Sequence, residues 1–566
     1  MRAVLARSIM AVLITAVAFI SSHAGRAPAG NAIIAAIDAD ASAGQITYET
    51  ALRYKLYTVL DLDRLPTKYR TLDSRPVKCG TPYVLEALAA APSLSTSFQS
   101  ELEAMADRPA ADSIYTSPRG WFQIHYNLTG TNAVSATDAD SSGRPDFIEK
   151  LALYFDSSWS HEVETLLWTR PPSDGTAGGD SLYDIYPTSL GLTYGITWPE
   201  SPGPEPWSDY TSYIVVNKSF LGFPPNDDPD GDQAGAMKVT AAHEFNHACQ
   251  LADNPLHLKV SESWCQELTA TWMEDVVYDA SNDNYNFLDD FFSVPAMSLF
   301  DNGDHKYGAF VFGEHIEETF GAPLMRDIWL RMRYATAVAS IDSALMGEGS
   351  GFRSVFGQFG SWNYFTGSRD LGLHYQEGSA YPLMPVTRVE SVYPITNRSG
   401  ASLQAMSADY IEFLPDGTGR DVVELKFNGS GAVKWRATAQ MLDSLGNLSS
   451  TAFALDSTTG DGAIHFGNFN HLAKVTLATA NVNMTAATAG YTYSFRFLLR
   501  ADCNDDGGLS IFDVLYLSDF IYANGPSPLP IWQVGDMNCS GDLDILDISL
   551  MIDYILKGGP APCAPL

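Results

Sequence analysis

Two histidines separated by three residues, with a glutamate directly after the first, constrain this chain more than any other feature. They are His243, Glu244 and His247 in the run AAHEFNHACQ. On a helix, residues four apart lie on the same face, so both imidazoles can bind one metal ion. The glutamate then lies close to a water on that ion, whose pKa the ion lowers, and can accept its proton. No Gly or Pro interrupts the run, so the pattern predicts a helix from Val239 to about Leu251 that carries a catalytic zinc ion.

The alternative, an ordinary buried helix, leaves two histidines and a carboxylate in a core. That arrangement costs free energy unless each group is hydrogen-bonded. A catalytic zinc ion also needs a third protein ligand and one open position. The next predicted helix, from Ser263 to Tyr278, supplies candidate carboxylates at Glu267 and Glu274, and Glu262 directly precedes it.

The two segments together resemble the gluzincin class of metallopeptidases. The resemblance rests on HEFNHACQ followed by Trp264-x-x-Glu267-x-x-Ala-x-Trp-Met-Glu, and it extends over roughly 115–370. In that class the third ligand is a glutamate at a set spacing after the second histidine, and this spacing selects Glu267. Thermolysin-like members place an aspartate where this chain has Thr271, so the resemblance leaves Glu274 or Asp275 to support the first histidine.

The resemblance implies amide hydrolysis by one zinc ion on His243, His247 and Glu267, with Glu244 as general base. A donor for the developing oxyanion is also required. The candidates are Tyr307 and His305 in the run HKYGAF, which resembles secreted bacterial peptidases with this architecture.

An acidic run from 138 to 149 fits the register of a twelve-residue EF-hand loop, with glycine at its sixth position. We expect one calcium ion in this loop. A strand-like segment, and not a helix, precedes it, so the loop is EF-like and not part of a full EF-hand. The alternative is an acidic solvated turn. The expected ligands are Asp138, Asp140, Ser142, the carbonyl of Arg144, Asp146 and Glu149.

Two further loops of this kind form an internal repeat at the C-terminus, each followed by an apolar helical run. The first offers Asp502, Asn504, Asp506, Gly508, Ser510 and Asp513, and the second offers Asp536, Asn538, Ser540, Asp542, Asp544 and Asp547. With aspartate at the twelfth position and no entering helix, the pair resembles the dockerin module, which anchors secreted enzymes to cohesin domains. The resemblance implies two calcium ions and a cohesin-type partner bound through Ile511, Phe512, Ile545 and Leu546. A plain calcium-stabilised terminus is the alternative.

At 566 residues the chain is too long for one core, and the changes in composition and periodicity along it suggest five segments. We expect a signal peptide at 1–24, a propeptide or N-terminal subdomain at 25–115, an α+β zincin-like peptidase domain at 116–375, an all-β sandwich at 376–500 and a small α-helical dockerin at 501–566. An N-terminal membrane anchor is the alternative to the signal peptide.

The net charge bears on the partners of the chain, and the predicted export bears on its cysteines. The formal net charge of −33 argues against nucleic acid and anionic membranes as partners. Export permits disulfides. Cys249 and Cys265 are one possible pair, while the connectivity of Cys503, Cys539 and Cys563 stays open.

We therefore predict a secreted zinc endopeptidase acting on protein or peptide substrates, with no stable membrane insertion after signal cleavage. Two alternatives remain. Dockerins usually accompany carbohydrate-active enzymes, so the chain is alternatively a polysaccharide hydrolase, which needs a pair of carboxylates that the sequence does not identify. A non-catalytic calcium-dependent adhesion or scaffold protein is the third possibility, although Glu244 is retained.

Overall fold

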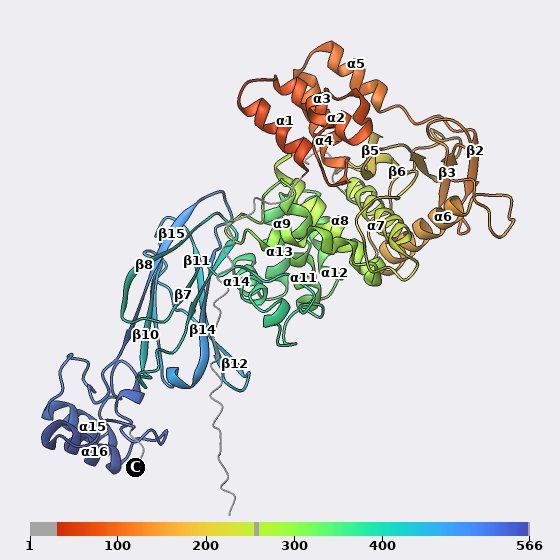
Figure 1. The fold of residues 1–566 in the computed structure, drawn as a ribbon. Coiled ribbons are helices and arrows are strands. Elements are labelled where there is room, and N and C mark those ends of the chain that lie inside the picture. The colour runs from red at the N-terminus through yellow and green to blue at the C-terminus, as the bar shows by residue number, and fades with distance from the viewer. Residues whose placement is uncertain (1–30, 254–259, 564–566) are drawn as a thin grey trace, which may run out of the picture.

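The computed structural model describes residues 31–253 and 260–563, so the predicted signal peptide lies outside the described residues. The molecule is elongated. A mixed helical and sheet region occupies one end, two β-sheets lie in the middle and a pair of helices lies at the other end (Figure 1). The expectation of a multidomain α+β protein is confirmed at this level.

The N-terminal region is a cluster of helices that also contributes one strand, β1 (Val77–Cys79). The side chain of Asn31 caps the first helix by accepting hydrogen bonds from the backbone N–H groups of Ile33 and Ile34. The helices pack around a core that includes Leu56, Val59 and Val84. They are α1 (Ala32–Ser42), α2 (Tyr48–Leu60), α3 (Thr67–Arg70), α4 (Thr81–Ala90) and α5 (Thr96–Met105).

A six-stranded sheet follows, in the order β1-β5-β6-β4-β3-β2. Its other strands are β2 (Ser113–Thr116), β3 (Phe122–Tyr126), β4 (Tyr183–Thr188), β5 (Thr193–Pro202) and β6 (Tyr210–Asn217). Strands β3, β4 and β6 are parallel, and β5 runs antiparallel to β6. Strand β1 adds to the outer side of β5 in parallel orientation, which makes the N-terminal region part of this sheet.

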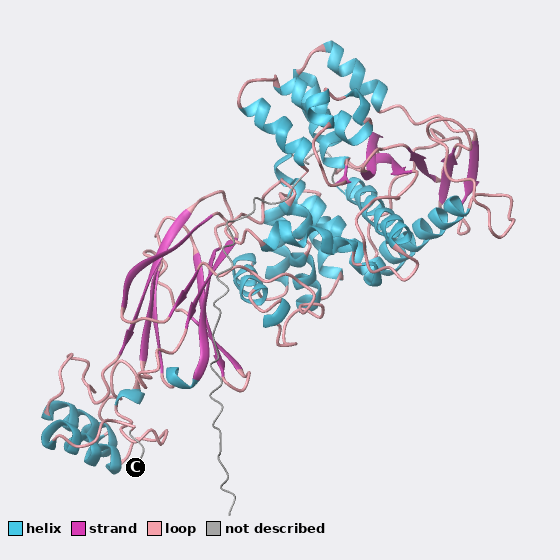
Figure 2. Ribbon diagram, in the orientation of Figure 1, coloured by secondary structure: helices cyan, strands magenta, loops and turns pink. Residues whose placement is uncertain are grey.

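Long helices cover the sheet and lead into a helical region (Figure 2). Phe245 of the central helix packs against Phe122 and Tyr183 of the sheet, which holds that helix to its face. The helices are α6 (Asp146–Trp159), α7 (Asp232–Asp253), α8 (Ser263–Tyr278), α9 (Leu288–Phe292), α10 (His305–Gly308), α11 (Val311–Phe320), α12 (Pro323–Met332), α13 (Ala337–Gly347) and α14 (Phe352–Asn363). One π-helical stretch, η3 (Ser160–Thr165), continues α6.

Two sheets with a shared apolar core come next, in the orders β13-β10-β15-β8 and β12-β11-β14-β9-β7. All neighbours are antiparallel except β7 and β9. The strands are β7 (Arg388–Glu390), β8 (Ile395–Leu403), β9 (Ser407–Phe413), β10 (Val423–Asn428), β11 (Trp435–Asp443), β12 (Leu448–Ala452), β13 (Asp461–Phe466), β14 (Leu472–Asn481) and β15 (Ala489–Phe497).

The C-terminal region holds two helices, α15 (Ile511–Ala523) and α16 (Ile545–Lys557). Leu517 and Met551 lie in its small core. A disulfide joins Cys539 to Cys563.

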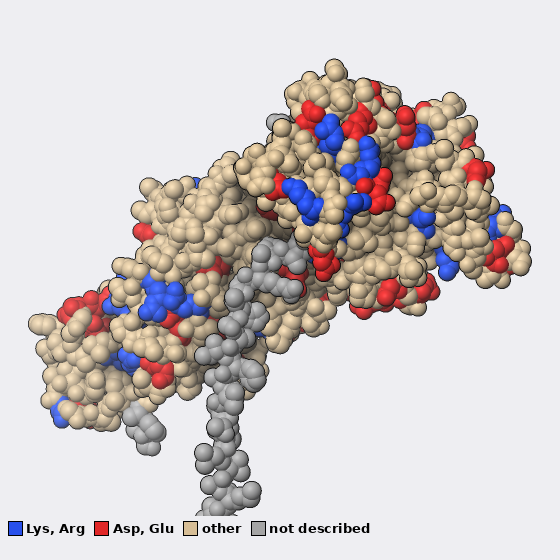
Figure 3. Space-filling model, turned by 45° about the horizontal axis from the view of Figure 1, so that its top comes forward, with Lys and Arg blue, Asp and Glu red and all other residues tan. Residues whose placement is uncertain are grey.

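On the face drawn in Figure 3, most basic side chains stand beside acidic ones, and one group of them gathers toward the left of the view. Among the described residues, no helix has both the length and the apolar character needed to cross a bilayer. Cys249 and Cys265 are free and buried, so the pairing that the sequence allowed is not formed.

Candidate metal centre

Helices α7 and α8 bring the three predicted zinc ligands together. The Nε2 atoms of His243 and His247 lie 3.1 Å apart. One oxygen of Glu267 lies 3.2 Å from His243 Nε2, and the other lies 3.2 Å from His247 Nε2. All three side chains are buried, because α8 packs directly against α7 and closes the site on that side.

The other ring nitrogen of each histidine is held by a second residue. His243 Nδ1 lies 2.7 Å from Glu274 Oε1, and His247 Nδ1 lies 2.9 Å from Gln250 Oε1. Both partners accept hydrogen bonds, so each Nδ1 carries the proton and each Nε2 is directed at Glu267. Of the two supports that the sequence left open, the structure selects Glu274, because Asp275 instead accepts from Asn284.

Electrostatics in the absence of metal show how strongly the cluster is coupled. Burial lowers the pKa of His243, but hydrogen bonds to Glu267 and Glu274 outweigh it and raise that pKa to about 9. The charges of the two histidines hold the pKa of Glu267 far below its usual range despite burial. Apart from the two imidazole nitrogens at 3.2 Å, the Glu267 oxygens have no partner among the described residues. Two imidazoles and a carboxylate that face one another in one buried cluster fit a divalent zinc ion.

Glu244 reaches toward the sheet on the same helix. Its Oε2 accepts hydrogen bonds from the hydroxyls of Thr197 on β5, at 2.7 Å, and of Thr81, at 3.2 Å. Its Oε1 has no partner in the part of the chain that the structure describes. Gly195 of β5 makes room for this side chain, since a Cβ there would lie 2.7 Å from Glu244 Cγ.

A fourth metal-binding side chain, Cys79, joins the cluster from the end of β1. The ligand atoms of Cys79, His243, His247 and Glu267 all lie within 4.8 Å of one another. The sulfur accepts a hydrogen bond from the backbone N–H of Thr81 at 3.4 Å. Cys79, Thr81 and Gly195 were not predicted as site residues, because no local pattern links them to a helix far along the chain.

The two candidates for an oxyanion donor lie in different places. The Tyr307 hydroxyl donates to the carbonyl oxygen of Cys79 at 3.4 Å, which places it beside the cluster. His305 instead bonds the carbonyl of Asp290 through Nδ1 and packs against Phe291. Burial lowers the pKa of His305, and no contact with the four-residue cluster is seen for it among the described side chains.

The acidic loop before α6 gathers three of its predicted ligands. Carboxylate oxygens of Asp138, Asp140 and Asp146 lie within 4.8 Å of one another. The hydroxyl of Ser142 contacts the carbonyl of Arg144 at 3.5 Å. Glu149 stands apart from the group and forms a 3.1 Å ion pair with the Arg144 side chain.

The two C-terminal loops have matching geometry. Asp502 accepts from the N–H groups of Asp506 and Gly507, as Asp536 does from those of Ser540 and Gly541. The last aspartates are equally matched: Asp513 accepts from Cys503 and Ser510, and Asp547 from Met537 and Asp544.

The other predicted ligands of these loops are held by local contacts. The Asn504 amide bonds Asp506, the Gly508 N–H bonds Asp506, Asn538 accepts from Ser540, and the Ser540 hydroxyl bonds the Asp542 carbonyl. Ser510 and Asp544 cap α15 and α16. Within the described ranges, no three acids of either loop meet within 4.8 Å, and the remaining predicted ligands are the amide, hydroxyl and carbonyl oxygens that calcium also accepts.

The predicted partner-binding residues lie at the starts of these helices and face solvent. Their exposed fractions are 44% for Ile511, 66% for Phe512, 55% for Ile545 and 57% for Leu546. Exposed apolar side chains at matching positions of a repeat form a surface suited to a protein partner.

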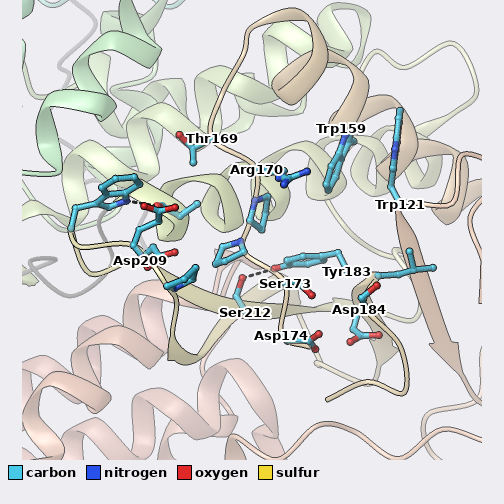
Figure 4. A pocket seen from close by; sticks show the side chains of 18 of the residues that line it. Trp121, Trp159, Thr169, Arg170, Ser173, Asp174, Tyr183, Asp184, Asp209 and Ser212 are labelled. Carbon is cyan, nitrogen blue, oxygen red and sulfur yellow. Dashed lines mark hydrogen bonds between the residues drawn. The ribbon is translucent and has the colours of Figure 1, made fainter. Parts of the chain in front are cut away.

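A cavity of about 720 Å³ lies near the sheet, away from the metal cluster (Figure 4). Trp121 and Trp159 stack at its wall with ring centres 5.5 Å apart. Two carboxylates of the wall, Asp174 and Asp184, form ion pairs with Arg108. No member of the metal cluster lines this cavity.

Comparisons with known proteins identify no family for this chain. No family model and no curated protein matches it. A solved structure of a family GH115 4-O-methyl-α-glucuronidase with specificity for decorated arabinogalactans is similar at 10% identity, covering 46% of this chain and 39% of that chain. The TM-score of that match is 0.14, which is too low to bear on fold or function.

Proposed function

We propose that the chain is a zinc-dependent endopeptidase. The observation that carries the proposal is the convergence of His243, His247 and Glu267, whose two carboxylate oxygens contact only the two imidazoles within the described part of the chain. Glu274 and Gln250 orient the two imidazoles toward the same point, as second residues do in protein zinc sites. The resemblance to gluzincin peptidases, with a zincin-like domain over 116–375, agrees with this ligand set.

The roles of the chain's own residues follow from their positions. Zinc bound there would supply a Lewis acid for the scissile carbonyl and would acidify water. Glu244 accepts the proton of the attacking water at Oε1, the oxygen free of partners, and delivers it to the leaving amine. Thr197 holds the other oxygen, which fixes the carboxylate in place. Tyr307, the hydroxyl beside the cluster, is the better placed oxyanion donor, and His305 is a structural residue.

The carbohydrate-hydrolase alternative has less support. The cavity in Figure 4 has two stacked tryptophans, a feature that suits a sugar ring. A glycosidase needs two carboxylates free to act as acid and base or nucleophile. Of the four acids that line this cavity, Asp174 and Asp184 pair with Arg108, and Asp209 accepts a hydrogen bond from the backbone N–H of Glu205.

For the C-terminal region we propose a dockerin-like module that binds two calcium ions and docks a cohesin-type domain. The matched hydrogen bonds of Asp502 and Asp536 support the repeat, and the exposed Phe512 and Leu546 support the docking surface. A further calcium ion is proposed at Asp138, Asp140 and Asp146. Export through residues 1–24 would deliver the protein to the cell surface or medium, where such a module operates.

Replacing Glu244 with Gln tests the proposed function. Gln keeps an oxygen to accept from Thr197 but cannot take a proton, so we expect zinc to remain bound at one ion per chain. The rate of casein or peptide cleavage should fall by about 10²–10⁴-fold. Elemental analysis and a fluorogenic peptide assay measure the two effects.

The matched control is Glu348→Gln, at an exposed glutamate just past α13. It should retain both zinc and the parent rate. Full activity of Glu244→Gln, or a purified protein that takes up no zinc, would refute the proposed function. Polysaccharide cleavage that survives chelation would favour the alternative.

A further inference from the structure

The N-terminal region closes the metal centre. Cys79 is fully buried, and its sulfur belongs to the same group of ligand atoms as His243, His247 and Glu267. Zinc prefers four ligands, and thiolate is among the strongest that proteins offer. Three protein ligands leave a position for water, whereas a fourth one fills it, and sites closed in this way are structural and not catalytic.

We propose that Cys79 is a fourth, inhibitory ligand of this site, and that the N-terminal region up to about residue 111 keeps the enzyme latent. The inference rests on the proposed function. The inference goes beyond the proposed function, because it assigns a metal ligand and a mode of regulation to the N-terminal region, which the sequence left open between propeptide and subdomain.

The backbone of the same segment occupies the edge of the sheet beside the metal. Val77 and Cys79 pair with Thr193 and Gly195 of β5. The N–H of Gly80 donates to the carbonyl of Gly195 at 2.9 Å. Extended peptides bind proteins by adding a strand to an exposed sheet edge, with main-chain hydrogen bonds of this kind. Strand β1 therefore takes the place in which an extended peptide substrate can pair with β5.

Each group that hydrolysis requires is in contact with this segment. The Thr81 hydroxyl donates to Glu244 Oε2, the proposed base. The carbonyl of Cys79 accepts from Tyr307, the proposed oxyanion donor. The segment thus contacts all three places at once, with the Cys79 sulfur at the metal position, the Thr81 hydroxyl at the base and the Cys79 carbonyl at the oxyanion donor. These contacts explain why the cluster is buried.

Buried ion pairs hold the segment in position. Lys78 Nζ lies 2.7 Å from Glu274 and 2.6 Å from Asp283. Arg75 pairs with Asp290, and its guanidinium lies 3.3 Å from Asp304. Buried pairs add little net stability but require correct placement of both partners, so they fix the register of β1. Glu274, which orients His243, is also the partner of Lys78, so the segment contacts the outer shell of the site as well.

The chain offers one clear place for release. Residues 110–112, between α5 and β2, are exposed and lie outside regular structure. Exposed connections of small residues are preferred cleavage sites. Release would withdraw the Cys79 sulfur from the metal position; the thiolate would then take a proton from solvent, and the vacated position would be open to water.

The test uses the full chain with cobalt in place of zinc. A cobalt–thiolate contact gives a near-ultraviolet charge-transfer band that histidine and carboxylate ligands do not give. We expect this band in the parent chain and in Cys503→Ala, the control at another buried free cysteine. We expect Cys79→Ala to bind cobalt without the band. Cobalt bound by the parent without the band overturns the inference alone, whereas no cobalt binding at all overturns the proposed function.

A second variant, with the recognition site of a specific protease placed over 109–112, tests latency. Minor states are commonly populated at ~0.1–10%, so cleavage should raise peptidase activity by roughly 10- to 1000-fold as the band disappears. The same variant before cleavage is the control. Loss of the band with an unchanged or reduced rate would show that the segment is an integral part of the enzyme and would overturn latency.

Discussion

Gly195 on β5 provides a direct test of the position of the proposed base. An alanine Cβ at this position would lie 2.7 Å from Glu244 Cγ, 2.9 Å from Glu244 Oε1 and 3.0 Å from Thr240 Cγ2. Ordinary contacts begin at 3.4 Å, so the Glu244 side chain must move by about 0.7 Å. Thr197 on the same strand limits that movement, because it bonds both the carbonyl and the carboxylate of Glu244.

The expected effect on the rate follows from this displacement. A misplacement of 1 Å at a reacting group can cost about 10²-fold, so we expect the kcat of Gly195→Ala to fall by roughly 10- to 100-fold. None of these contacts involves His243, His247 or Glu267, so zinc content should not change. Overpacking should also lower the free energy of unfolding by about 1–3 kcal/mol.

The assay compares Gly195→Ala with the parent, both carrying the protease site at 109–112. Zinc content and the thermal midpoint are measured on the intact chains, and kcat on a fluorogenic peptide is measured after cleavage. Gly490→Ala on β15 is the control, since an added Cβ there meets nothing within 4 Å. A parent-like kcat in Gly195→Ala would refute the argument that Glu244 must be held at this point. Loss of zinc together with activity would also refute it, because the effect would then pass through the ligands.

Three further predictions concern the outer shell, pH and calcium. Glu274→Gln keeps an acceptor for His243 but loses the negative charge, so zinc affinity should fall by about 10- to 100-fold, as measured by chelator competition. The control, Glu317→Gln on α11, should show no such loss. Burial, reinforced by the charge of Glu377, raises the pKa of Asp275 to about 8. The folded state then holds a proton on Asp275 that the unfolded state releases above about pH 3.9. The free energy of unfolding should therefore fall by up to about 1.4 kcal/mol per pH unit as the pH rises from 4 to 8. Asp275→Asn should flatten that dependence of the thermal midpoint, and an unchanged slope would contradict the assignment. Calcium removal should lower the midpoint of the C-terminal transition, and calorimetric titration should then find two sites there; a transition that ignores calcium argues for a plain helical terminus.

Local patterns in the sequence were enough to locate the elements that carry the proposed ligands. The apolar periodicity predicted helices over 239–251 and 263–278, and both lie within observed helices. The strand-like segment expected before the acidic loop is β3. Helices α4 and α5 are separate, because Pro92 and the capping Ser95 interrupt the chain between them.

Contacts between distant segments could not be predicted from local patterns, and they determine which groups meet at the candidate site. Thr81 and Glu244 are 163 positions apart in sequence, yet they share a hydrogen bond. The choice between Glu274 and Asp275 also depended on which side of α8 faces α7, a matter of helix packing that spacing alone does not settle. Lys78 shows the consequence most clearly. It is buried with Glu274 and Asp283, an arrangement that leaves two carboxylates without a counter-charge once the segment departs. A buried charge without its partner is costly, so departure must admit water to this side of the site. The same event that uncovers the metal would therefore hydrate the cleft in which hydrolysis takes place.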